Sequence, residues 1–140
     1  QHPDREGRII VPHTLVFTGF RWHVRAWCEK NREFRDFVLS RFRGEAELLD
    51  ESPHCADDDA RGQLAVDLVI APDPRLSATQ KEVVARDYGM RAGRLRLRTR
   101  ATLVSYLLRL LQLDPHGGQQ APLAQQIVLE NRDELEPYLF

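Results

Sequence analysis

Eight consecutive residues decide the fold of the first half of the chain: Arg21-Trp22-His23-Val24-Arg25-Ala26-Trp27-Cys28. Apolar and polar side chains alternate here, and the side chains of a β-strand alternate between the two faces of its sheet. One face of a strand over residues 20–28 is therefore expected to point to a core, and it carries Trp22, Val24, Ala26 and Cys28. The other face carries two guanidinium groups, an imidazole and an indole, from Arg21, His23, Arg25 and Trp27.

Similar short runs lie on both sides of this segment. Residues 9–11 end at Pro12, residues 15–17 end at a Thr-Gly turn, and residues 34–42 form a returning strand after the polar turn 29–33. Four short strands between residues 9 and 43 predict a small closed or nearly closed β-barrel.

A different pattern follows Gly44. Residues 44–62 hold seven acidic residues and one basic residue without clear periodicity, which is typical of a linker. Strands are then predicted over residues 64–71, 93–99 and 126–130, and helices over 77–89, 101–113 and after 131. This order predicts an α+β module with helices on one face of a sheet. The very apolar helix 101–113 is the surface expected to support a dimer contact.

Composition excludes several classes of protein. A chain of 140 residues, 42% hydrophobic and 29% charged, is typical of a soluble globular protein, and no apolar run is long enough to span a membrane. Two cysteines, Cys28 and Cys55, make no disulfide framework, which favours a cytoplasmic location. Because the chain begins at Gln1 without a signal segment, we expect a fragment of a longer intracellular protein.

The basic strand face has two interpretations. Guanidinium groups bind phosphates bidentately and aromatic faces stack on bases, so this face predicts an anion or nucleotide site. Alternatively, it is a solvated face whose arginines pair with Glu29, Glu33 and Asp36. Arg35 and Arg41 share a phase with apolar residues of the returning strand, so each is either a ligand contact at a barrel rim or part of a structural ion pair.

Residues 21–28, followed by Phe34-Arg35-Asp36-Phe37-Val38-Leu39-Ser40-Arg41, resemble the WYL domain, with Trp22-His23-Val24 in the place of the name-giving Trp-Tyr-Leu. The opening Ile10-Val11-Pro12-His13-Thr14-Leu15 is similar to WYL repressors associated with the phage-defence systems BREX and CBASS. Residues 64–140 resemble the C-terminal extension called WCX at Pro72-Asp73-Pro74, Asp87-Tyr88-Gly89-Met90 and Arg100-Ala101-Thr102-Leu103.

The resemblance implies a transcription regulator made of three parts. Operator DNA would be bound by a winged helix-turn-helix that residues 1–140 do not include, a ligand by the WYL barrel, and a second copy by the WCX module. The implied fold class is α+β, with a small Sm/SH3-like barrel followed by a ferredoxin-like module. The predicted divisions are a lead-in over 1–8, the WYL domain over 9–49, an acidic linker over 50–62 and the WCX dimerisation domain over 63–140.

The resemblance also implies a basic pocket in the WYL domain that binds single-stranded DNA or signalling oligonucleotides, which makes an oligonucleotide or nucleotide the expected ligand. Position by position, the resemblance assigns ligand contacts to six residues: His13, His23, Arg25, Arg35, Ser40 and Arg41. His23 replaces the usual tyrosine, which puts stacking in doubt and leaves hydrogen bonding, or charge beside a phosphate.

Other functions stay open at this point. Arg94, Arg96, Arg98 and Arg100 form a row on one strand face that is either solvated, paired with acids of a second chain, or bound to nucleic acid. An Sm-like nucleic-acid-binding module without a regulatory role is the main alternative. No catalytic motif, cofactor motif or zinc spacing stands out, so we expect no enzyme, no cofactor, no metal and no membrane partner.

Overall fold

The structure, a computed structural model, describes residues 7–115 and 120–139. It divides the chain into two compact units, residues 1–63 and 64–140. Among the described residues, no helix has the length and apolar character needed to cross a membrane.

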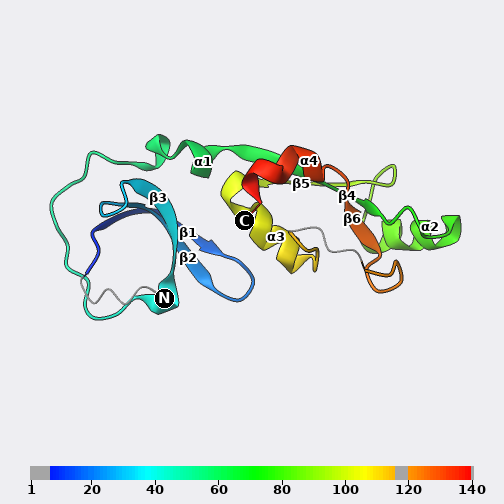
Figure 1. Cartoon of the computed structure of the whole chain (residues 1–140), viewed down its shortest axis with the longest axis horizontal. Helices are drawn as coiled ribbons and strands as arrows, with labels where there is room; N and C mark the ends of the chain where they lie inside the picture. The colour runs from blue at the N-terminus through cyan, green and yellow to red at the C-terminus, as the bar shows by residue number, and fades with distance from the viewer. Residues whose placement is uncertain (1–6, 116–119, 140) are drawn as a thin grey trace. The chain divides into compact units, whose positions relative to one another are not determined.

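The first unit is built on an antiparallel sheet of three strands in the order β1-β2-β3 (Figure 1). These strands are β1 (Ile10–Phe17), β2 (Trp22–Cys28) and β3 (Glu33–Val38). Pro12 does not end a strand as predicted, because β1 runs through it. Proline is tolerated at sheet edges and next to bulges, and β1 provides both: it is an edge strand, and its register shifts between Pro12 and Thr14.

The predicted closed barrel is absent from the described residues. After Val38 the chain forms the 3-10 helix η1 (Leu39–Arg41), so the returning strand is shorter than the predicted segment 34–42. β1 and β3 are left as the two edges of an open sheet.

Both faces of the central strand β2 are largely covered. Val24, Ala26 and Cys28 are buried, as the alternation predicts, but Trp22 at the start of the strand is 50% exposed. On the opposite face His23 and Arg25 are buried as well, so this face is not solvated there. The pairing of Arg25 with Asp36 that the second interpretation expected is present, with Arg25 Nη1 3.5 Å from Asp36 Oδ2.

The acidic stretch after β3 belongs to the first unit and contains local structure. Residues 50–62 were predicted to be a linker, but they contain the 3-10 helix η2 (Ala56–Asp58). The short helix α1 (Ala60–Gln63) begins in the same segment and ends one residue after it. Asp59, between these two helices, is buried.

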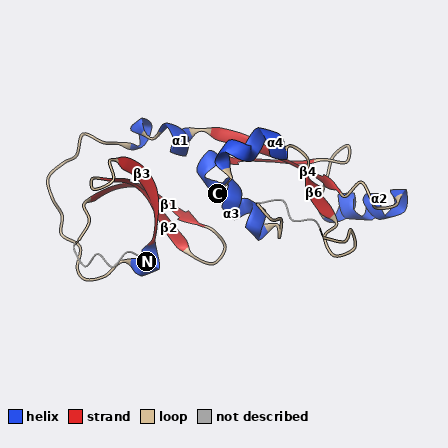
Figure 2. Cartoon of the chain, viewed as in Figure 1, coloured by secondary structure: helices blue, strands red, loops and turns tan. Residues whose placement is uncertain are grey.

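The second unit is a mixed α/β unit, as predicted. Its antiparallel sheet has the order β5-β4-β6, formed by β4 (Ala65–Pro72), β5 (Leu95–Arg100) and β6 (Ile127–Leu129). Figure 2 shows the helices α2 (Ala78–Asp87), α3 (Val104–Leu110) and α4 (Arg132–Leu135) of this unit. The unit also contains the 3-10 helices η3 (Ala101–Leu103) and η4 (Glu136–Tyr138).

The core of the second unit lies on one face of its sheet. Leu68 and Ile70 of β4 alternate with exposed Asp67, and they belong to a cluster that includes Val84 of α2 and Leu108 of α3. The capping box that opens α2 is present: the backbone N–H of Gln80 donates to Ser77 Oγ at 3.2 Å, and the backbone N–H of Ser77 donates to Gln80 Oε1 at 2.9 Å.

Candidate functional site

A β-bulge aims His13 into the first unit. The register of β1 and β2 pairs Pro12 with Ala26 and Thr14 with Arg25, which leaves His13 as the extra residue. Bulges re-aim a side chain, and only 6% of the His13 side chain is exposed. Its Nε2 lies 2.9 Å from Asp59 Oδ2, and its Nδ1 lies 2.7 Å from Thr14 Oγ1.

Arg25 holds the same carboxylate from the central strand. Its Nε donates to Asp59 Oδ2 at 2.7 Å and its Nη2 donates to Asp59 Oδ1 at 3.1 Å, a bidentate pair. Its Nη1 lies 3.5 Å from Asp36 Oδ2 on β3. We call His13, Arg25, Asp36 and Asp59 the carboxylate cluster.

The two carboxyl groups of the cluster have pKa values shifted in opposite directions. Burial favours a raised pKa for Asp59, but hydrogen bonds from Arg25, the Gly62 amide and His13 outweigh it and hold the pKa below its ordinary value. For Asp36, burial raises the pKa and the attraction of Arg25 and His23 only partly opposes it. The pKa of Asp59 therefore lies below that of Asp36, and Asp59 is the carboxyl group of the cluster that stays ionised to lower pH.

An aromatic stack adjoins the carboxylate cluster. The ring of His54 lies 4.0 Å from the ring of Trp27 with an interplanar angle of 16°, and the edge of Phe34 meets Trp27 at 5.2 Å. Among the described residues, Trp27 Nε1 is buried without a hydrogen-bond partner. Trp27 and Arg25 share one face of β2, about 7 Å apart. The segment 54–59 thus covers this face of β2: the His54 ring stacks on Trp27, and the Asp59 carboxylate binds Arg25.

The structure brings some of the six predicted ligand contacts together and separates others. His13 and Arg25 meet at Asp59, and His23 lies on the same face of β2, where the charges of Arg21 and Arg41 contribute to lowering its pKa. Arg35 pairs with Ala26 in the register and lies on the opposite face, with its Nε 3.6 Å from Glu33 Oε1. Ser40 is exposed in η1.

Sequence reasoning missed Asp59 and His54. Asp59 is the last of three consecutive aspartates, and no periodicity distinguishes it from exposed Asp57 and Asp58. The only local signal is Gly62, whose amide donates to Asp59 Oδ1 at 3.0 Å.

His23 is expected to make the first unit less stable in acid. Burial first, and then the charges of Arg21 and Arg41, lower its pKa below 6.5, although Asp36 opposes this. As the pH falls through 6.5, the unfolded chain takes up the proton before the folded one does, so the unfolding free energy decreases. Urea unfolding at several pH values between about 8 and 5 is expected to show a smaller decrease for His23→Gln than for the wild type.

Asp36 changes the pH dependence of the unfolding free energy in the opposite direction, because its raised carboxyl pKa makes the folded state take up a proton more readily than the unfolded state. Asp36 is present in both proteins, so the difference between them reports His23 together with its charge interaction with Asp36. Parallel pH profiles of the two proteins would contradict the assignment.

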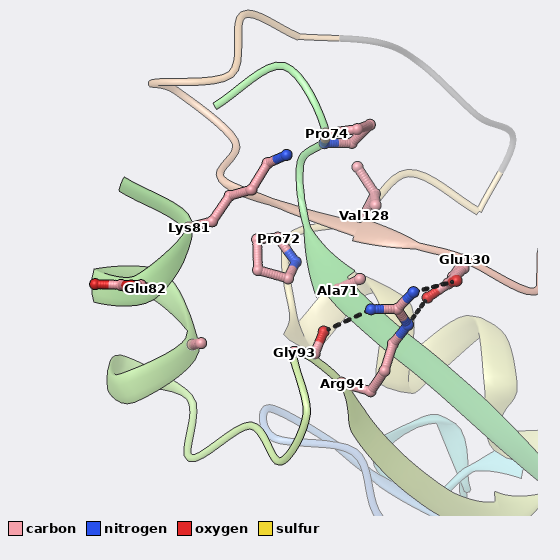
Figure 3. Close-up of a pocket in the computed structure, with 10 residues that line it drawn as sticks. Ala71, Pro72, Pro74, Lys81, Glu82, Gly93, Arg94, Val128 and Glu130 are labelled. Atoms are coloured by element: carbon pink, nitrogen blue, oxygen red, sulfur yellow. Dashed lines mark hydrogen bonds and ion pairs between the residues drawn. The ribbon is translucent and has the colours of Figure 1, made fainter. Parts of the chain in front are cut away.

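The second unit contains a pocket of about 500 Å³ at one end of its sheet (Figure 3). Its floor is apolar, formed by Ala71, Pro72 and Val128. Arg94 lies at its rim, donating to Gly93 O at 3.1 Å and to Glu130 Oε1 at 2.9 Å. Within the parts of the chain that the structure describes, no group of three or more His, Cys, Asp or Glu residues is placed to hold a metal ion.

Comparison with known proteins agrees with the two units. Residues 65–135, about half of the chain, match the family described as BrxR transcriptional regulator, C-terminal dimerization domain. Residues 1–46 match the WYL domain. These are families of regulatory and dimerisation domains, not of enzymes.

Curated relatives cover nearly the whole chain. A protein of Escherichia coli (strain KTE188) named DNA-binding transcriptional repressor CapW is 38% identical over 133 residues, which are 95% of this chain and 44% of the relative. Proteins of the same name from Pseudomonas aeruginosa and Stenotrophomonas maltophilia are 36% and 35% identical over 96% and 98% of this chain, and over 44% and 46% of their own length. The chain therefore spans less than half the length of these relatives.

The resemblance to WYL regulators is confirmed, and the chain belongs to the family described as BrxR transcriptional regulator, C-terminal dimerization domain, with a WYL domain ahead of that domain.

Proposed function

We propose that this chain is the ligand-sensing and dimerising portion of a cytoplasmic transcription regulator, and that its ligand is a single-stranded or signalling oligonucleotide. Operator DNA would be bound through a winged helix-turn-helix of the longer protein. The names of the relatives, DNA-binding transcriptional repressors that are more than twice as long, support this division of labour. The Sm-like description of the first unit and the ferredoxin-like description of the second belong to the same proposal.

The proposed ligand class rests on one observation: His13 and Arg25 both bind the carboxylate of Asp59. A buried guanidinium and an imidazole that hold a carboxylate bidentately offer the same donors to a phosphate oxygen pair. Beside them, Trp27 offers an aromatic face for a base and an indole N–H for a ligand acceptor. Cations next to an aromatic platform are what a nucleotide requires.

In this proposal the segment 54–59 occupies the ligand site when no ligand is bound. His54 takes the place of a base on Trp27, and Asp59 takes the place of a phosphate on Arg25. An oligonucleotide would displace both. Arg41 and His23 would supply further contacts, and Arg35 and Ser40 would contact parts of a longer oligonucleotide outside the cluster.

Displacement of this segment provides a route to the dimerisation domain. Asp59 is followed by α1, and the chain enters β4 of the second unit at Ala65. A ligand that binds only the displaced state shifts the equilibrium toward it by its differential affinity. The segment released in this way leads directly into the dimerisation domain, and through it the spacing of two DNA-binding domains would change.

Two substitutions are expected to change oligonucleotide affinity in opposite directions. His54→Ala removes the internal ring from Trp27 and is expected to tighten binding roughly twofold to tenfold, the value of one stacked pair. Arg41→Ala removes an exposed cation near His23 and is expected to weaken binding roughly tenfold, the value of a charge-assisted contact. Fluorescence anisotropy with a short labelled oligothymidine measures both.

Arg43→Ala is the matched control, because Arg43 is an exposed arginine two residues beyond Arg41. It is expected to change the affinity much less than Arg41→Ala does. Equal losses for the two arginines would favour the Sm-like module that binds by net charge alone. Unchanged affinity in His54→Ala would argue against an occupied site.

A further inference from the structure

The second unit leaves most of one face of its sheet uncovered; at one end of that face, residues of α2 line the pocket of Figure 3 together with Ala71 and Val128. Core residues of β4 and of the helices lie on the opposite face, which includes Leu68 and Ile70. We call the open side the outer face, and it is formed by Asp67, Val69 and Ala71 of β4, Arg96, Arg98 and Arg100 of β5, and Val128 of β6.

Charge on the outer face is divided between its two edges. β5 is one edge strand, and its Arg96, Arg98 and Arg100 are exposed. The other edge continues from β6 into α4 and carries an acidic set: Glu130, Asp133 and Glu134. Among the described residues, neither Arg96 nor Arg100 has a carboxylate within ion-pair distance.

β4 lies between the two edges, and the same β4 residues contact the basic edge on one side and the acidic edge on the other. Val69 pairs with Arg96 on one side, and its amide donates to Asn131 Oδ1 on the other at 3.0 Å. One step along the strand, Asp67 pairs with Arg98, and its carbonyl accepts from Asn131 Nδ2 at 2.8 Å. The basic and the acidic edges therefore run side by side, one strand apart.

We propose that a second copy of this chain binds the outer face through a two-fold axis that lies above β4 and parallel to it. Rotation about such an axis places the basic edge of each copy over the acidic edge of the other. The contact is isologous, so it forms twice and closes. The proposal rests on the dimeric regulator proposed above, and it assigns the surface that joins the two copies.

The centre of the outer face suits such a contact. Val69 and Val128 are partly buried and Ala71 is buried, so together they provide a small apolar centre, and Ala71 and Val128 continue into the floor of the pocket of Figure 3. An apolar centre within a charged rim is the usual anatomy of a protein interface.

Two other assignments are weaker on the same observations. Helix 101–113, the surface expected from the sequence, has Val104 and Leu108 fully buried in the core of its own unit. A nucleic acid along the arginine row would meet the carboxylates of the same face, including Asp67 between the edges and Glu130 beside Arg94. Mixed charge favours a protein partner that carries the same two edges.

The test exchanges the charges of the two edges. Arg96→Glu with Arg100→Glu makes both edges acidic, and Asp133→Lys with Glu134→Lys makes both basic. Each double variant alone is expected to dissociate at least about a hundredfold more readily than the wild type, because like charges meet at both contacts. An equimolar mixture is expected to restore the dimer, because each altered edge then faces an opposite charge. Sedimentation velocity of the full chain measures all three.

Arg86→Glu, an exposed charge reversal on α2, is the control and is expected to leave the dimer intact. Circular dichroism reports whether each variant folds. Recovery of the dimer in the mixture shows independently that both variants are folded. A monomeric wild type would overturn the proposed dimer itself. A dimeric wild type whose two double variants also remain dimeric would overturn only the surface. A double variant that stays dimeric but loses oligonucleotide binding would assign the arginine row to nucleic acid instead.

Discussion

Replacing Asp59 by alanine is expected to lower the unfolding free energy of the first unit by about 3–5 kcal/mol, the cost of removing one member of a buried ion pair. The substitution leaves the Arg25 side chain, 11% exposed, and the His13 side chain, 6% exposed, without their shared acceptor. Of the contacts described above, Arg25 then keeps the one to Asp36, at 3.5 Å. Because both tryptophans of the chain lie in the first unit, urea unfolding followed by tryptophan fluorescence measures this unit alone.

Asp57→Ala is the matched control for this experiment. Asp57 lies in the same acidic run, carries the same charge and is exposed. Its loss is expected to change the unfolding free energy by no more than about 0.5 kcal/mol, as is usual for a surface position. Similar losses for Asp57→Ala and Asp59→Ala would mean that net charge, and not the carboxylate cluster, determines the stability of the segment.

The contrast between these aspartates shows where prediction from the sequence reaches its limit. The alternation of residues 21–28 places His23, Arg25 and Trp27 on one face, because a period of two is built into any β-strand. What covers that face is decided by a segment some thirty residues further along, which has no periodicity. Burial of Asp59 depends on how η2 and α1 turn the chain, and three identical aspartates carry no information about that turn.

The prediction of four short strands failed for a local reason. Pro12 was expected to end a strand, but at a sheet edge beside a bulge a proline removes no ladder hydrogen bond that the sheet needs. The same bulge sends His13 toward Asp59, so the feature that hid the length of β1 also builds the carboxylate cluster. In the second unit the mixed α/β order was predictable, because strand periodicity, the capping box at Ser77 and helix periodicity all agree.

The contacts of Asp59 and His54 also explain why an acidic stretch with linker composition is ordered on the sheet. Each anchors one end of the segment 54–59, the first on Arg25 and the second on Trp27. Neither anchor is an apolar core contact of the kind that is lost only on global unfolding. A segment held in this way is suited to local release by a competing anion.

Gly62→Ala is expected to break the carboxylate cluster without removing any charge. A Cβ at this position would lie against Asp59 Oδ2 and 2.6 Å from Asp59 Cγ, closer than real side chains come. The backbone of Gly62 is not in the left-handed region, so the substitution itself introduces no conformational strain. The carboxylate must move away from Arg25, and we expect a loss of about 3 kcal/mol or more in the unfolding free energy, approaching that of Asp59→Ala.

A double-mutant cycle separates this cause from a general effect on α1. In the Asp59→Ala background the obstructing carboxylate is gone, and alanine is a better helix former than glycine by about 1 kcal/mol. Gly62→Ala is therefore expected to be neutral or stabilising there, although it is strongly destabilising in the wild type. Such a change of sign is a coupling energy between residues 59 and 62 and cannot arise from two independent effects. If the two losses simply add, the glycine matters for the helix and not for the carboxylate. The coupling therefore decides whether the close approach of Gly62 to Asp59 holds the segment in place on Arg25.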